Sequence, residues 1–149
     1  MATEILIIDD NADIRNIIND LIIDAGYKTR LAANYNQALS EIDKKLPDVA
    51  ILDVKLDKGD NDGIELLSHI KSKDKDVPVI IISGHANIEM AVKSLHEGAF
   101  EFIENHLIKK DCLILLEEQL KTTISKSKIK NMKQNYFHLM NLLEIVKIF

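Results

Sequence analysis

The chain of 149 residues is 46% hydrophobic and 29% charged, which suits one globular domain and excludes a disordered or fibrous protein. Residues 121–149 carry six lysines and one glutamate, which leaves 13 basic and 23 acidic residues in the first 120, and so acidic a body excludes nucleic-acid binding by that part. The single cysteine, Cys112, excludes an intrachain disulfide, and no apolar run approaches the ~20 residues of a membrane span, so we expect a cytoplasmic protein.

Short apolar runs rich in β-branched residues alternate along the chain with segments of helical periodicity. The runs predict strands at residues 5–8, 27–32, 49–53, 77–82 and 99–103, of which the second and fifth are weaker and edge-like. The periodic segments predict helices at residues 12–25, 34–46, 63–72 and 86–97, and a fifth that begins near Ile108. The expected helix starts are Asn11, Asn34 and Ser83, and the expected stops are Gly26, Pro47 and Gly98. This alternation predicts a doubly wound (βα)5 parallel sheet with helices on both faces.

Acidic and hydroxyl side chains stand where the predicted strands end. They are Asp9 and Asp10 after the first strand, Asp53 at the third, Ser83 at the fourth, and Glu104 and Asn105 at the fifth. In such a sheet the ligand site lies beyond the carboxyl ends of the strands, so we expect these groups to converge. Closely packed carboxylates need a cation, and oxygen ligands suit Mg2+. One such aspartate alone is as well explained by a turn or helix cap, but the whole set indicates phosphoryl transfer to Asp53 beside Mg2+.

Over about residues 3–120 the chain closely resembles the receiver domain of bacterial two-component response regulators, particularly the NtrC/NtrX-like type. The segments that carry the resemblance are ILIIDDNADIR, DVAILDVKL followed by DGIELL, VPVIIISGH and AVKSLHEGAFEFIE. The resemblance implies a flavodoxin-like sheet of order 2-1-3-4-5, a sensor histidine kinase as partner, and Asp53 as the phosphoacceptor. It also implies that Mg2+ is bound by Asp9, Asp10, Asp53 and the backbone carbonyl of Lys55. By the same resemblance, Ser83 is the hydroxyl switch and Phe102 the coupled aromatic switch.

The fifth strand departs from this family at the position that usually holds a lysine. Receivers of this type have Lys and Pro after the segment FIE, where this chain has Asn105 and His106. Asparagine is neutral and shorter, so the site loses a charge and a contact to the phosphoryl group, commonly a few kcal/mol. Lys55 and His85 are candidates to replace this cation, because each stands two residues beyond a site residue, although an exposed loop lysine is more often only solvated.

Two other protein classes fit the sequence less well. Phosphatases of the haloacid dehalogenase type need a second aspartate two residues after the nucleophile, where this chain has Lys55. Flavodoxin-like proteins bind the phosphate of FMN in a loop rich in Ser, Thr and Gly after the first strand, where this chain has acids. We therefore expect a signalling switch and not an enzyme.

The C-terminal part is predicted to be a helical extension, residues 121–149, after a receiver domain at residues 1–120. Leu113, Leu116, Leu120 and Ile124 form one helical stripe, and Leu139, Leu142, Leu143, Val146 and Phe149 form a second apolar face. That second face either folds back on its own domain or pairs with another copy, and we favour a homodimer through this helix or through the fourth and fifth helices. Neither an ATPase module nor a helix-turn-helix fits after residue 120, so no DNA-binding domain is expected in this chain, and the basic run at 121–133 is expected to be solvated.

Two functional hypotheses follow. In the first, the chain is a phosphoacceptor switch, phosphorylated on Asp53 with the help of Mg2+ and read out through Ser83, Phe102 and the face of the fourth helix, fifth strand and fifth helix. In the second, it is a degenerate receiver that acts as a phosphorylation-independent binding and dimerisation module. The clustered acids favour the first hypothesis, and Asn105 favours the second.

Overall fold

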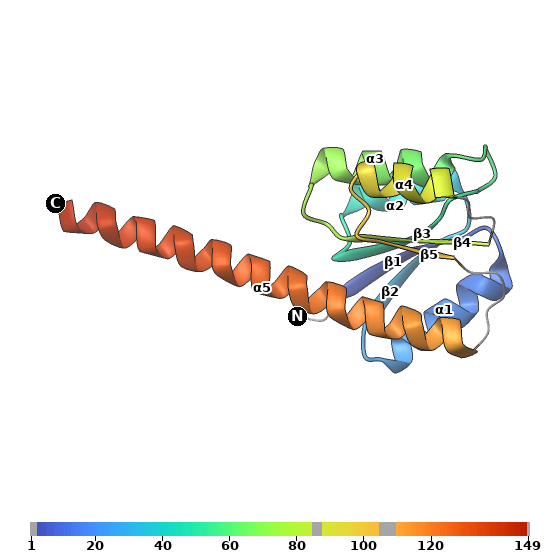
Figure 1. Cartoon of the computed structure of the whole chain (residues 1–149), viewed down its shortest axis with the longest axis horizontal. Helices are drawn as coiled ribbons and strands as arrows, with labels where there is room; N and C mark the ends of the chain where they lie inside the picture. The colour runs from blue at the N-terminus through green and yellow to red at the C-terminus, as the bar shows by residue number, and fades with distance from the viewer. Residues whose placement is uncertain (1–2, 85–87, 105–109, 149) are drawn as a thin grey trace.

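The computed structural model describes residues 3–84, 88–104 and 110–148, with the backbone alone at 101, 104, 110–117, 119, 131 and 143–148. Strands and helices alternate along the chain (Figure 1). They are β1 (Glu4–Ile8), α1 (Ala12–Asp24), β2 (Lys28–Ala32), α2 (Tyr35–Lys44), β3 (Val49–Asp53), α3 (Asp62–Lys73), β4 (Val79–Ser83), α4 (Ile88–His96), β5 (Glu101–Glu104) and α5 (Lys110–Ile148). This order confirms the predicted alternation.

The five strands form one parallel sheet in the order β2-β1-β3-β4-β5. The predicted fold class, a doubly wound sheet of order 2-1-3-4-5, is therefore confirmed. The register pairs Ile8 with Leu52 across β1 and β3, and Asp53 with Ile82 across β3 and β4. Because β1 and β3 are neighbours with their carboxyl ends at the same edge, the residues that follow Ile8 come close to Asp53.

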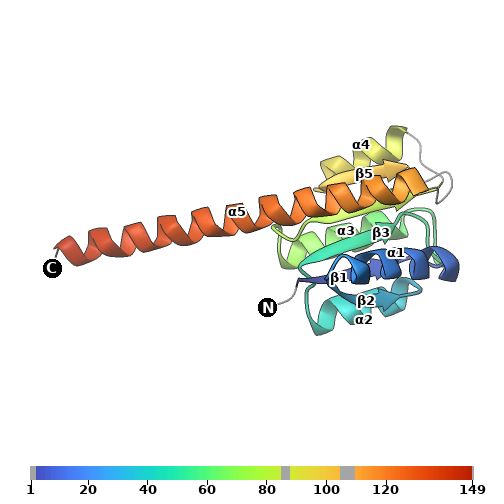
Figure 2. The ribbon, with the colours of Figure 1, turned by 90° about the horizontal axis from the view of Figure 1, so that it is seen from below.

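The helices cover both faces of the sheet, with α1 and α5 on one face and α2, α3 and α4 on the other (Figures 1 and 2). Alternate residues of β1 separate the two core layers, since side chains of a strand point to opposite faces. Ile5 and Ile7 pack in the layer beneath α1 and α5, whereas Leu6 and Ile8 pack in the layer beneath α2, α3 and α4. All four side chains are at most 1% exposed, as expected of a central strand that is buried on both faces.

Two asparagines begin helices as predicted. The Oδ1 of Asn11 accepts a hydrogen bond from the backbone N–H of Ile14 at 3.1 Å, and that of Asn34 accepts one from Gln37 at 2.8 Å. Each bond satisfies an N–H that has no partner within its own helix. Gly26 follows α1 with φ of +94°, a conformation that favours glycine.

The expectations for Ser83 and for the fifth strand need correction. Ser83 does not begin a helix but is the last residue of β4. The fifth strand begins at Glu101 instead of at residue 99, because the chain first turns through Gly98, whose φ is +100°. The N–H of Phe100 then donates to the carbonyl of Val79 at 2.8 Å, which aligns the following residues with β4.

The last helix is one uninterrupted element of 39 residues, about 58 Å long at 1.5 Å per residue, and it projects far beyond the sheet (Figures 1 and 2). Its nearer part packs on the domain, where Leu120 is 1% and Ile124 is 6% exposed in the core layer shared with α1. The predicted division at residue 120 therefore falls inside a continuous helix. Among the described residues, none of the helices is both long enough and apolar enough to cross a membrane.

Candidate functional site

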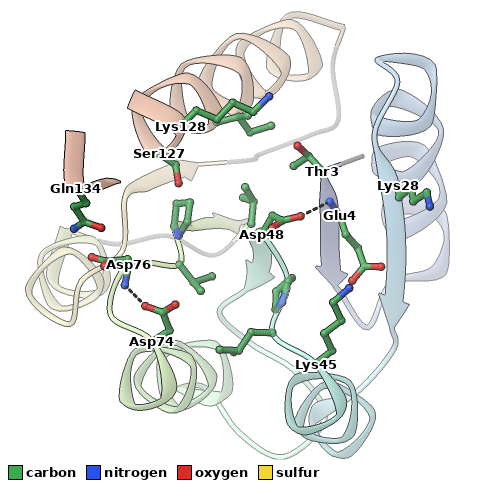
Figure 3. A pocket seen from close by; sticks show the side chains of 16 residues that line it. Thr3, Glu4, Lys28, Lys45, Asp48, Asp74, Asp76, Ser127, Lys128 and Gln134 are labelled. Carbon is green, nitrogen blue, oxygen red and sulfur yellow. Dashed lines mark hydrogen bonds between the residues drawn. The ribbon is translucent and has the colours of Figure 1, made fainter. Parts of the chain in front are cut away.

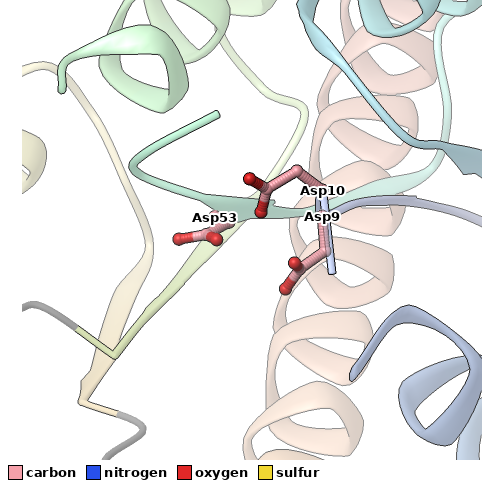
Figure 4. Close-up of side chains that lie close together, drawn as sticks. All are labelled: Asp9, Asp10 and Asp53. Carbon is pink, nitrogen blue, oxygen red and sulfur yellow. The ribbon is translucent and has the colours of Figure 1, made fainter. Parts of the chain in front are cut away.

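Three carboxylates meet at the carboxyl edge of the central strands (Figure 4). Asp9 and Asp10 follow β1 directly, and Asp53 is the last residue of the neighbouring β3. One oxygen from each residue lies within 4.8 Å of an oxygen from each of the others. The sequence predicted this convergence from the places where the strands end.

Burial and mutual repulsion set the ionisation of this cluster. Asp9 is only 5% exposed, and burial raises its pKa to about 6, although the N–H of Asn11 donates to its Oδ1 at 2.9 Å and partly offsets the effect. Burial also raises the pKa of Asp53 to about 7, with the charge of Asp9 as the next cause. Hydrogen bonds from the backbone of Lys55 and Val54 act in the opposite direction. Without a cation, the cluster therefore holds protons close to neutral pH.

The donor set suits a hard divalent cation. Carboxylate oxygens are the ligands that Mg2+ prefers, and it is commonly held by only one or two carboxylates with other oxygens completing its shell. A divalent charge at this point removes the repulsion that raises the pKa of Asp9 and Asp53. The residues present therefore fit a Mg2+ site.

The loop after β3 is held by residues that the sequence analysis did not single out as site residues. Asp62 is 4% exposed, and its Oδ2 accepts hydrogen bonds from the N–H groups of Lys58 at 2.8 Å and Gly59 at 2.9 Å. The N–H of Gly63 donates to the carbonyl of Val54 at 2.8 Å. These bonds fix the course of the chain immediately after Asp53.

Gly63 allows α3 to approach the end of β3 closely. A Cβ atom at this position would lie 2.3 Å from the carbonyl oxygen of Asp53 and 2.7 Å from the Cα of Val54, distances that no side chain tolerates. The segment DGIELL, which helped to identify the family resemblance, contains both Asp62 and Gly63. Its physical role is to dock α3 against the backbone that carries Asp53.

Arg15 supports the other half of the cluster. Its Nη1 donates to the backbone carbonyl of Asp9 at 2.8 Å from the first turns of α1. The guanidinium also lowers the pKa of Asp9, as a smaller effect than burial. This contact was not predictable from the sequence, because nothing in the pattern of α1 distinguishes Arg15 from a solvated surface residue.

Lys55, the candidate for replacing the missing cation, points to an acid of its own loop. Its Nζ lies 3.4 Å from Oδ1 of Asp60, and the two side chains are 57% and 75% exposed. A salt bridge this exposed stabilises little. A contact between Lys55 and a phosphoryl group would therefore have to replace a weak pair.

The two predicted switch residues lie on β4, the neighbour of β3, and on β5, the next strand beyond β4. Ser83 ends β4, is 2% exposed, and follows Ile82, the register partner of Asp53. Phe102 lies on β5, is partly buried, and packs against the core layer beneath α4. The positions Asn105, His106 and His85 lie outside the described residues, so the expectations for them stay predictions.

A cavity of about 800 Å3 lies at the opposite edge of the sheet, where the strands begin (Figure 3). Acidic and basic groups line it in similar numbers, namely Glu4, Asp48, Asp74 and Asp76 with Lys28, Lys45 and Lys128. Asp48 is already engaged, because it accepts a hydrogen bond from the N–H of Glu4 at 2.8 Å. The lining of this cavity therefore favours neither an anionic nor a cationic ligand.

Residues 5–116 match the response regulator receiver domain family. The chain belongs to this family. The receiver domain is 38% identical over 134 residues to the nitrogen assimilation regulatory protein NtrX of Azorhizobium caulinodans, a match that covers 90% of this chain and 30% of that protein. The predicted likeness to NtrC/NtrX-like receivers is thereby confirmed.

Two further relatives are matched over most of their own length. It shares 38% identity over 99 residues with sporulation initiation phosphotransferase F of Bacillus subtilis, covering 66% of this chain and 78% of that one. The crystal structure of the receiver domain of NtrX from Brucella abortus is 41% identical, with a TM-score of 0.67, and the match covers 77% of this chain and 95% of that one. The chain thus spans less than a third of the NtrX protein of A. caulinodans, but nearly all of an isolated NtrX receiver.

Proposed function

We propose that this receiver domain is a phosphoacceptor switch, that it accepts a phosphoryl group on Asp53 from a sensor histidine kinase, and that it is not itself an enzyme. The observation that carries the proposal is the cluster of Asp9, Asp10 and Asp53, whose oxygens lie within 4.8 Å of one another at the carboxyl edge of a receiver fold. The family match supports the kinase as partner.

The reaction needs an ionised Asp53 in a fixed position. A carboxylate oxygen of Asp53 attacks the phosphorus of a phosphohistidine, so that an O–P bond forms, the P–N bond breaks, and the departing imidazole nitrogen takes up a proton. Asp9, Asp10, Asp53 and the backbone carbonyl of Lys55 would hold Mg2+, whose charge offsets that of the phosphoryl oxygens. Docking of Gly63 on the backbone of Asp53 and Val54 holds the nucleophile in place.

The change in charge at Asp53 supplies the switch. An acyl phosphate adds negative oxygens beside the end of β4, where the hydroxyl of Ser83 can donate a charge-assisted hydrogen bond that the unmodified state does not offer. A contact made in only one state shifts the balance between two conformations. We place the readout on Phe102 and on α4, whose Ile88, Val92 and Leu95 are 82%, 49% and 50% exposed.

The distal part of α5 supports a homodimer as the output. Its apolar residues Ile129, Met132, Tyr136 and Leu139 are 51%, 68%, 66% and 55% exposed, and they recur at the alternating spacing of three and four residues that is typical of a coiled coil. Leu143 and Val146 continue this spacing in the sequence. Pairing of two copies along this seam would cover side chains that the domain itself does not reach.

One observation favours a second function. Asn105 stands where receivers of this type carry a lysine, and Lys55 is paired with Asp60 at 3.4 Å. A site without that cation stabilises a phosphoryl group less. In this alternative the chain binds its partners through α4 and α5 without phosphorylation.

The two functions differ in a direct test. The purified chain is incubated with acetyl phosphate and Mg2+, and its intact mass is compared with that of the Asp53→Asn variant. The switch predicts a gain of one phosphoryl group that is absent from the variant and from a sample with chelator in place of Mg2+. An unchanged mass would leave the binding module as the function.

A further inference from the structure

A second cavity, of about 420 Å3, lies where α5 passes the turn between α4 and β5. The end of α3 and the loop before β4 form one side of it, the turn at Gly98 to Phe100 forms another, and α5 closes it. Among the described residues that line it, four are lysines, namely Lys71, Lys75, Lys126 and Lys130, and one, Asp76, is an acid. The lining therefore carries a net positive charge in a domain that is acidic as a whole.

Lys71 forms the fixed inner part of this basic cavity. Its Nζ donates to the carbonyls of Val77 at 2.6 Å and Lys75 at 3.1 Å, and its methylene chain packs against Gly98, where a Cβ would lie 3.3 Å from the Cε of Lys71. Burial lowers the pKa of Lys71, the charges of Asp76 and Asp74 raise it, and the ammonium of Lys130 lowers it as a smaller effect. Two ammonium groups from different elements thus repel each other across the cavity.

Asp76 compensates only part of this charge. It accepts a hydrogen bond from Nζ of Lys130 at 2.6 Å, and the charges of Lys75 and Lys71 also lower its pKa. Three ammonium groups therefore share Asp76, and Asp74 adds a smaller compensating charge at Lys71. The residual positive charge leaves room for an anion between α5 and the body of the domain.

The fourth lysine borders an aromatic ring. Nζ of Lys126 lies 5.5 Å from the centroid of Phe100, within the range of a cation–π contact. Phe100 is partly exposed in the turn before β5 and lines the same cavity. The cavity therefore offers a flat apolar surface next to its ammonium groups.

We propose that this cavity binds a small anion with two or more phosphate groups, of the pyrophosphate or nucleoside diphosphate class, and that the bound anion ties α5 to the domain. Lysine binds phosphate as a mobile point charge, and the volume lies within the range of small-molecule sites. A long nucleic acid fits less well, because its further phosphates would meet the acidic body. The larger cavity at the start of the strands, with its balanced charges, offers no comparable site.

The test is calorimetric titration of the whole chain with pyrophosphate and, separately, with ADP. The buffer contains chelator and no Mg2+, so that the aspartate cluster repels both anions and phosphorylation at Asp53 plays no part. We expect one binding site, weakened about tenfold or more in Lys130→Glu and in Lys126→Glu, because each change removes a charged hydrogen-bond donor. Lys28→Glu, which makes the same change of charge at an exposed position at the start of β2, is the matched control and should bind as the unaltered chain does.

The relative affinities of ADP and pyrophosphate show which part of the anion the cavity recognises. Tighter binding of ADP than of pyrophosphate, lost in Phe100→Ala, would assign the nucleoside to the Phe100 ring, and equal binding would assign the affinity to the phosphates alone. Hydrogen exchange at the described residues 120–130 of α5 should slow when the anion binds. Absence of binding by both anions, or equal weakening by Lys28→Glu and Lys130→Glu, would overturn the proposal without touching the role of Asp53.

Discussion

The ionisation of the aspartate cluster predicts a steep pH dependence of Mg2+ binding. The pKa is about 6 for Asp9 and about 7 for Asp53, both raised chiefly by burial. At pH 6 about half of the Asp9 carboxyls and about a tenth of the Asp53 carboxyls are ionised, whereas at pH 8 about nine-tenths or more of each are. The form with both carboxyls ionised, which binds the metal, is thus about 20 times more abundant at pH 8 than at pH 6. The Kd for Mg2+ should therefore fall about 20-fold from pH 6 to pH 8.

Isothermal titration calorimetry in two buffers of different ionisation enthalpy measures both the Kd for Mg2+ and the number of protons released on binding. Near pH 6.5, about one proton should be released for each Mg2+ bound, since about a quarter of Asp9 and three-quarters of Asp53 are then protonated. In the Asp53→Asn variant only Asp9 titrates in this range, so binding should be weaker and its pH dependence should shrink to about twofold. A Kd that stays constant from pH 6 to pH 8, or binding without proton release, would refute the assignment.

Three further predictions concern stability and assembly. Gly63→Ala should lower the free energy of unfolding in urea by about 1–3 kcal/mol, because the new Cβ would overlap the backbone at the end of β3. Gly59→Ala is the control and should change little, since the atom nearest to its new Cβ is 3.8 Å away. Equal effects of the two changes would contradict the role of Gly63. Without Mg2+, the melting temperature should fall as pH rises from about 4 to about 8, because the folded state holds protons on Asp9 and Asp53 that the unfolded state releases near pH 4. Added Mg2+ should abolish this fall. A melting temperature that does not change with pH in chelator would contradict the raised pKa values. In light scattering, Leu139→Glu should convert a dimer to a monomer, whereas Asn141→Glu, on the same helix outside the apolar seam, should leave the dimer intact. A mass of one chain for the unaltered protein at tens of micromolar would contradict the proposed dimer.

The fold was predictable because its signals are local. The run Ile5 to Ile8 is apolar at every position, which marks a strand buried on both faces, and the structure buries it in two separate core layers. Asn11 and Asn34 were recognisable as helix caps from sequence alone. The start of β5 was misplaced because a turn at Gly98, and not hydrophobicity, decides where pairing with β4 begins.

The site was predictable only in part. Asp9, Asp10 and Asp53 stand at strand ends, so the topology alone brings them together. The docking of Gly63 depends on how closely α3 approaches β3, which no periodicity reports. The pair of Lys130 and Asp76 joins residues 54 positions apart on different elements, and its place in a basic cavity emerges only when α5 is seen to continue past the sheet.

Chemical trapping of the acyl phosphate can show whether Asp53 itself receives the phosphoryl group. The chain is treated with acetyl phosphate and Mg2+, reduced with borohydride, which converts an acyl phosphate of aspartate to homoserine, and mapped by peptide mass spectrometry. Phosphorylation of Asp53 predicts homoserine at position 53 that depends on Mg2+ and on the phosphodonor. An unreduced Asp53 in a sample that carries the phosphoryl group at another residue, or no modification at all, would contradict it.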